Sequence, residues 1–101
     1  MFPNKRYATT NVMREVPLGL QIFLWQCVDS IPIDADYLQI FRLSKAEGLQ
    51  KIIHEQECPP YKKEYLFAPI FPLVEAKIYV INDETHATML FADEYKKMTF
   101  L

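Results

Sequence analysis

The sequence predicts a single α+β domain over residues 1–101, with an antiparallel sheet of about five or six strands packed on one main helix. This class is indicated by one helical segment, at residues 17–31, and by several apolar or β-branched segments of strand length. With 101 residues and 50% hydrophobic content, the chain is long enough to bury a core without metals or disulfides.

The predicted helix at residues 17–31 is apolar on two sides. It begins at Pro17, which suits a first helical turn, and ends before Pro32, because proline disfavours helical geometry in the residue before it. One apolar stripe should face the core: Leu20, Phe23, Leu24, Cys27, Val28 and Ile31.

A second stripe lies on roughly the opposite face of the same helix and consists of Leu18, Ile22 and Trp25. A helix that is apolar all round must be covered all round. The cover comes from the chain's own residues, from a second copy or from another protein. We therefore predict a protein interface at Leu18, Ile22 and Trp25, with cover by the chain itself as the alternative.

Strands are predicted from β-branched and aromatic content. They lie at residues 5–12, 37–43, 64–67, 76–81 and 86–92. Residues 45–57 fit two structures. A turn at Gly48 followed by a strand is preferred because Ile52 and Ile53 favour strands, although Ser44 and Glu47 also match a helical capping box.

The remaining segments are predicted to be loops. Residues 68–74 contain two prolines and several apolar residues but no charge, so we expect this loop to lie flat on the body of the protein. Residues 82–85 have turn composition, and residues 93–101 form a tail.

Several predicted strands are apolar on both faces, whereas one helix covers a single face. Leu38 and Ile40 face one side, and Phe41 and Leu43 face the other. The second face needs a strongly coiled or barrel-like sheet, the 68–74 loop or a second copy of the chain. A closed sheet would also permit a ligand-binding barrel with an apolar cavity.

Composition narrows the classes of partner. The net charge of −2 argues against binding to nucleic acid or to acidic lipid. Residues 17–31 are too few, and too interrupted by polar residues, to cross a membrane, and the first residues do not resemble a signal peptide. We therefore expect a cytosolic protein in which Cys27 and Cys58 are reduced and unpaired.

The titratable residues suggest few sites. His54 and Cys58 are about 13 Å apart on a strand, too far to share an ion, so no metal site is predicted. The catalytic candidates are His54 with Glu57 or His86, as acid and base in a small hydrolase or ribonuclease. With two glycines in the chain there is no phosphate-binding loop, and no cofactor is expected. The leading hypothesis is a non-enzymatic interaction module that self-associates or binds a protein partner.

Three blocks of the sequence resemble a small bacterial family, domain of unknown function 960. The first is residues 16–26, the second is residues 53–61 with 64–67, and the third is residues 76–83 with 86–90 and 94–95. The resemblance implies a short cytosolic protein of Gram-positive bacteria, with strands around His54 and Ile78. It implies no activity and no cofactor. Glu84 stands where the family pattern leads us to expect a glycine in the last hairpin turn.

Overall fold

The computed structural model describes residues 5–83 and 85–98. Its elements follow the chain in this order: β1 (Lys5–Ala8), α1 (Thr10–Glu15), α2 (Leu18–Asp29), β2 (Leu38–Ala46), β3 (Leu49–Gln56), β4 (Tyr61–Phe67), β5 (Ala76–Asn82), β6 (His86–Phe91) and α3 (Ala92–Met98). The fold is therefore α+β, as predicted, and strands occupy the regions of His54 and Ile78 that the family resemblance implies.

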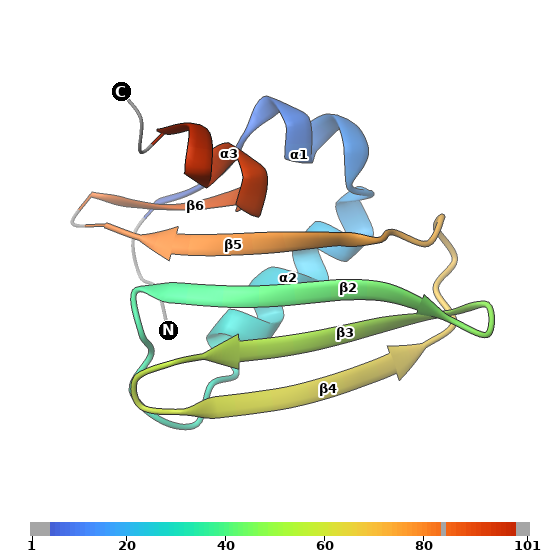
Figure 1. Cartoon of the computed structure of the whole chain (residues 1–101), viewed down its shortest axis with the longest axis horizontal. Coiled ribbons are helices and arrows are strands. Elements are labelled where there is room, and N and C mark those ends of the chain that lie inside the picture. The colour runs from blue at the N-terminus through green and yellow to red at the C-terminus, as the bar shows by residue number, and fades with distance from the viewer. Residues whose placement is uncertain (1–4, 84, 99–101) are drawn as a thin grey trace.

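The six strands form one open sheet in the order β1-β6-β5-β2-β3-β4 (Figure 1). Neighbouring strands are antiparallel except for β1, which runs parallel to β6, so the sheet is mixed. Because β1 and β4 are edges, the alternative of a closed, barrel-like sheet is wrong.

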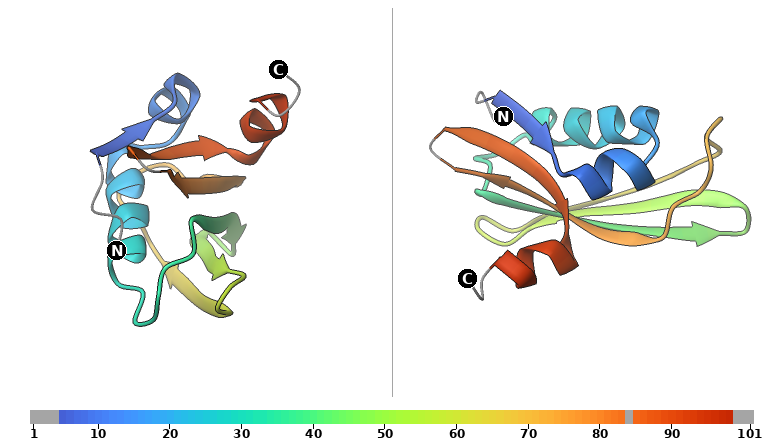
Figure 2. Two further views of the ribbon diagram at one scale, coloured as in Figure 1. Left: turned by 90° about the vertical axis from the view of Figure 1, so that its left-hand side faces the viewer. Right: turned by 90° about the horizontal axis from the view of Figure 1, so that it is seen from above.

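The helix α2 covers one face of the sheet, and the short helix α3 lies on the opposite face (Figure 2). The core forms between α2 and the strands beneath it. Its fully buried side chains include Leu20, Leu24, Val28, Phe41, Ile52, Ile78, Val80 and Met89. Phe23, also on α2, packs edge-on against Tyr65 of β4 with ring centroids 5.1 Å apart. The predicted inner stripe of the helix is thus the side that packs on the sheet.

The segment with two interpretations is a β-hairpin, as preferred. β2 and β3 pair from Ile40 with Glu55 to Ala46 with Leu49, so only Glu47 and Gly48 form the turn. Both have positive φ, 53° and 81°. Two such residues between antiparallel strands match the right-handed twist of the strands, and glycine adopts this backbone at no steric cost.

The prediction of a strand through residues 5–12 is wrong in its second half. β1 ends at Ala8, and α1 begins after Thr9. The hydroxyl of Thr9 accepts a hydrogen bond from the backbone N–H of Val12 at 3.3 Å, which caps the new helix. Threonine favours strands by propensity, but here its capping hydrogen bond satisfies a helix N-terminus instead.

The prediction that residues 93–101 are only a tail is also wrong for the part that the structure describes. Ala92–Met98 form α3, with Asp93 and Glu94 in the first turn. Acidic side chains there stabilise the positive end of the helix. α3 supplies cover for the second face of the sheet that the sequence did not reveal (Figure 2). Glu84, Phe100 and Leu101 lie outside the described residues.

The uncharged loop at residues 68–74 lies against the body, as predicted. Buried Gln50 fixes its end by donating to the carbonyl of Val74 at 3.0 Å and accepting from the N–H of Val74 at 2.9 Å. The ring of Phe71 packs on Gly19 so closely that a Cβ there would be 3.0 Å from it. The loop therefore covers the start of α2, although Ile70 remains fully exposed.

Candidate functional site

His54 is completely buried beneath α2. It lies on the same face of β3 as Ile52, pairs across the sheet with Phe41 and stacks on the Phe41 ring with centroids 4.3 Å apart. Tyr61 of β4 meets the imidazole edge-on at 5.5 Å. Rings therefore line two sides of this histidine, and no solvent reaches it.

A buried network of amides holds the imidazole. Gln39 donates from its Nε2 to the carbonyl of Asp36 at 2.9 Å and to Oε1 of Gln56 at 2.7 Å. The side-chain oxygen of Gln39, Oε1, lies 2.6 Å from Nε2 of His54. Because an amide oxygen can only accept, this ring nitrogen carries the proton and donates to Gln39. Gln56 completes the network, because its Nε2 donates to the carbonyls of Asp34 and Pro59.

Burial controls the charge of this histidine. Desolvation lowers the pKa of His54 to about 4 from the usual 6.5, because a cation loses its hydration in an apolar site. The other ring nitrogen, Nδ1, is buried and has no hydrogen-bond partner within residues 5–83 and 85–98. His54 is therefore a neutral core residue at neutral pH, and it has no path to a substrate in solution.

His86 lies at the start of β6 on the other face of the sheet. Thr85 lies 2.7 Å from its Nδ1, and Asp83 lies 3.4 Å from its Nε2. Tyr7 packs against the imidazole edge-on. The backbone N–H groups of His86 and Thr85 donate hydrogen bonds to the Asp83 carboxylate and lower its pKa, and the larger effect comes from His86. These contacts close a polar turn.

The catalytic candidates do not come together. β2 and β5 separate the strands that carry His54 and His86, and the two side chains lie on opposite faces. Glu57 is exposed in the turn after β3, and among the described residues the buried His54 ring forms a hydrogen bond with Gln39 alone. No acid–base pair forms from these residues.

Metal ligands are not assembled either. Among residues 5–83 and 85–98, no group of His, Cys, Asp and Glu is arranged to hold a metal ion. Cys27 and Cys58 are free thiols, the first buried and the second exposed. Burial raises the pKa of the Cys27 thiol, so it remains protonated and unreactive.

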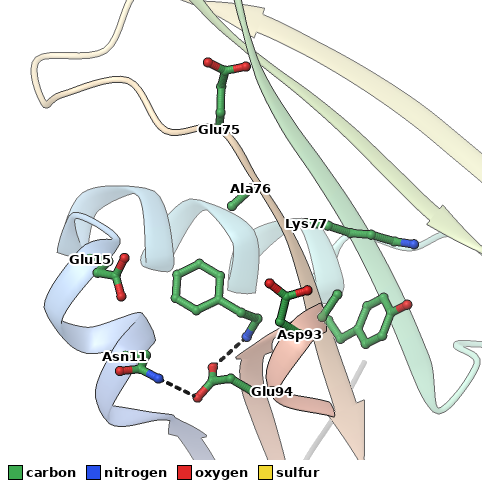
Figure 3. Close-up of a pocket in the computed structure, with 10 residues that line it drawn as sticks. Asn11, Glu15, Glu75, Ala76, Lys77, Asp93 and Glu94 are labelled. Carbon is green, nitrogen blue, oxygen red and sulfur yellow. Dashed lines mark hydrogen bonds between the residues drawn. The ribbon is translucent and has the colours of Figure 1, made fainter. Parts of the chain in front are cut away.

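A pocket of about 450 Å³ opens where α1, α3 and the start of β5 meet (Figure 3). Its polar lining comprises Asn11, Glu15, Glu75, Lys77, Asp93 and Glu94. Figure 3 shows Glu75 and Lys77 pointing away from Asp93 and Glu94, so the charged groups do not converge on one ligand position.

Glu94, at the floor of this pocket, has a structural role. Its Oε1 accepts from the hydroxyl of Thr9 at 2.8 Å and from the backbone N–H of Phe91 at 2.9 Å. Its Oε2 accepts from the amide of Asn11 at 3.2 Å (Figure 3). One carboxylate thus caps α3 and ties it to α1, as the third residue of a helix does in a capping box.

A smaller pocket of about 220 Å³ lies near His86, under Tyr95 of α3. Its floor is apolar, with Ile81 and Leu90 from β5 and β6. The space is a seam between α3 and the sheet, and the polar groups of the Asp83 turn already bind one another.

The outer stripe of α2 is covered at one end and open at the other. Trp25 is half-buried: it packs against the core cluster, and the guanidinium of Arg6 lies 4.9 Å from its ring centroid. Arg6 also forms an ion pair with Asp29 at the end of α2. In contrast, Leu18 is 69% exposed and Ile22 is 49% exposed.

A further exposed apolar side chain belongs to the preceding helix, α1. Met13, at the end of α1, is 66% exposed. Between Leu18 and Val28, α2 contains no charged residue, although surface helices normally have a charged outer side. We call Met13, Leu18 and Ile22 the α2 surface.

The buried glutamines are the polar residues that sequence reasoning missed. Gln50 and Gln56 lie on the inner face of β3, at the same alternation as Ile52 and His54. This alternation could have predicted that both glutamines are buried, because every second residue of a half-buried strand faces the core. Gln39 shares its alternation with Phe41 on β2, but this strand is apolar on both faces, so the sequence did not show which face is the core.

Residues 5–94 match the family described as "Staphylococcal protein of unknown function (DUF960)". The fold is similar to that of a solved structure, the crystal structure of a protein of unknown function from Enterococcus faecalis, with a TM-score of 0.79. The two proteins share 22% sequence identity, and the match covers 90% of each chain. No curated protein matches the sequence. No described helix is long and apolar enough to span a bilayer.

Proposed function

The chain belongs to the DUF960 family of Staphylococcal proteins of unknown function, and from this premise we propose that it is a cytosolic, non-enzymatic interaction module that self-associates through the α2 surface. The observation that carries the proposal is the uncharged outer side of α2, with Leu18 and Ile22 in water. Interface centres are depleted of charged residues, whereas free surfaces are not.

A second copy fits this surface because the stripe is symmetric about Ile22. Leu18 lies one helical turn before it and Trp25 lies one turn after it, under Arg6. Two such helices packed antiparallel across a twofold axis would place Ile22 against its own copy and Leu18 near the partner's Trp25. The ion pair of Arg6 with Asp29 would lie at the rim, where charges are tolerated.

The energy balance predicts a reversible dimer. Burying the exposed parts of Met13, Leu18 and Ile22 would contribute about 3–5 kcal/mol per copy, at roughly 1.5–3 kcal/mol for a whole side chain. Both copies together would gain about twice that, which is similar to the roughly 4–15 kcal/mol that association costs. We therefore expect association that depends on protein concentration.

A hydrolase built on His54 with Glu57 or His86 has no comparable support. His54 is buried and stacked on Phe41, Glu57 is exposed in a turn, and His86 lies across the sheet. A general acid or base must reach the proton that it transfers.

Sedimentation over a range of concentrations tests the proposal. The average mass of the wild type should rise with concentration, and Ile22→Asp should weaken association by at least about tenfold, because it places a charge at the centre of the interface. Ile33→Asp is the matched control: Ile33 is also an exposed isoleucine, but it lies in the link after α2. Equal association of the wild type and Ile22→Asp would overturn the proposal, as would an equal loss in the control.

A further inference from the structure

We propose that β4 forms a second, independent contact between copies of this chain, by antiparallel pairing with β4 of another copy across a twofold axis at Glu64. β4 is an edge of the sheet: in the part of the chain that the structure describes, it pairs with β3 alone. Its seven residues contain no proline. An edge strand of this kind presents a row of backbone N–H and C=O groups that another strand can pair with.

The two faces of β4 differ in chemistry. Tyr61, Tyr65 and Phe67 point toward α2, and the rings of Tyr65 and Phe67 both lie 5.1 Å from the ring of Phe23. Lys62, Glu64 and Leu66 alternate with them and are exposed on the outer face; Leu66 is 58% exposed. Any added strand must match this alternation to keep both faces continuous.

A second copy of β4 matches it over the whole strand. Glu64 is the central residue of Tyr61–Phe67, so a twofold axis there opposes Tyr61 to Phe67 of the other copy and keeps rings on the side of α2. It opposes Lys63 to Tyr65, a contact that already exists within one chain, where the Lys63 ammonium lies 5.2 Å from the Tyr65 ring centroid. Such aromatic and cation–ring pairs across strands are stabilising.

The charged side chains on the outer face of β4 can be accommodated in this pairing. The two Glu64 carboxylates would meet at the axis, but each already has Lys51 of its own chain at 3.6 Å. Lys62 of the other copy would lie diagonally across from each Glu64, within reach of a long side chain. On the other side of Lys62, the outer face continues to Glu55 and Arg42, which pair at 3.1 Å. The diagonal contacts between Lys62 and Glu64 would therefore offset the repulsion between the two opposed Glu64 carboxylates.

The same lysines disfavour other strands. Lysines on an edge discourage pairing with unrelated chains, because a foreign strand leaves them without a counter-charge. In the twofold arrangement Lys62 lies opposite Leu66 and diagonally across from Glu64 of the other copy, and Lys63 lies opposite Tyr65. The other edge of the sheet, β1, offers only four residues. The sequence of β4 thus favours a second copy of itself as the occupant.

A cysteine at the axis tests the arrangement directly. Residues opposed in an antiparallel pair have Cα atoms about 4.5–5.5 Å apart, which suits a disulfide. Glu64→Cys should therefore form a dimer through a disulfide under mild oxidation. Leu66→Cys is the matched control: it faces Lys62 of the other copy, so the two Leu66 positions are about 13 Å apart along the strands. Both variants should include Cys58→Ser, because Cys58 is an exposed thiol.

The experiment is done with Ile22→Asp present, so that its outcome is separate from that of the α2 surface. We expect the Glu64→Cys chain to yield about tenfold more disulfide-linked dimer than the Leu66→Cys chain, because only the first meets the distance requirement. Equal yields, or no linked dimer from Glu64→Cys, would overturn the proposal. The α2 surface is judged independently, by whether Ile22→Asp weakens association of the otherwise unmodified protein.

Discussion

Lowering the pH should destabilise this protein through one residue, His54. In the folded chain its pKa is about 4, and in the unfolded chain it returns to 6.5. Between these values the unfolded state binds a proton that the folded state does not, so the free energy of unfolding falls as the pH falls. The contribution of His54 is complete above pH 6.5 and is lost progressively toward pH 4.

The size of the effect follows from the pKa difference. At about 1.36 kcal/mol per pKa unit, the loss is about 2 kcal/mol at pH 5 and about 3 kcal/mol at pH 4. That is a large part of the roughly 5–15 kcal/mol that stabilises a typical domain. The physical cause is the site itself: the rings of Phe41 and Tyr61 line two sides of the imidazole, and in the described part of the chain its hydrogen-bond partner is a neutral amide.

Urea denaturation of the wild type and of His54→Gln between pH 8 and pH 4.5 measures the effect. Glutamine keeps a side-chain donor for Gln39 but does not titrate, so the variant should lose most of the pH dependence over this range. His86 is present in both proteins and cancels in the comparison. An equal dependence of the free energy of unfolding on pH in both proteins would contradict this role of His54. A midpoint near 6.5 for the His54 signal in an NMR titration would contradict it as well.

Further predictions concern the buried network, the helix cap and the tryptophan. Gln56→Leu removes the side-chain amide that forms hydrogen bonds with Asp34, Asp36, Gln39 and Pro59. The free energy of unfolding, measured by urea denaturation, should fall by about 3 kcal/mol, because the buried partners of this amide lose their hydrogen bonds. Glu94→Ala should cost about 1–2 kcal/mol and reduce the amide hydrogen-exchange protection of α3, whose capping carboxylate it removes. Arg6→Ala should shift the emission of the single tryptophan, Trp25, to longer wavelength, since the guanidinium covers its ring. An unchanged spectrum would show that Arg6 does not shield the indole.

Local patterns were sufficient for the parts of the fold that neighbouring residues decide. Prolines bracket the segment of α2, and Gly48 supplies the positive φ between β2 and β3. The strands at Leu38–Ala46 and Ala76–Asn82 followed from their apolar and β-branched residues. In each case the controlling interaction lies within a few positions along the chain.

The prediction failed where a distant residue decides the local structure. The sequence predicts a strand through Thr9 and a tail from residue 93, whereas Glu94 accepts hydrogen bonds from Thr9, from Asn11 and from the backbone N–H of Phe91 before α3. This carboxylate joins residues more than 80 positions apart. Each helix has its own local cap, from Thr9 and from Glu94, but the hydrogen bond that joins these two side chains lies in no window of sequence.

In the candidate site, too, neighbouring residues decide some features and distant residues decide others. The amino-acid sequence by itself established that α2 has an apolar outer side, because helical spacing alone places Leu18, Ile22 and Trp25 together. Only the tertiary structure decided that Arg6 covers Trp25 while Leu18 and Ile22 stay open, and that His54 is sealed among glutamines. Periodicity determines which face a side chain takes, whereas burial depends on which distant segment packs over that face.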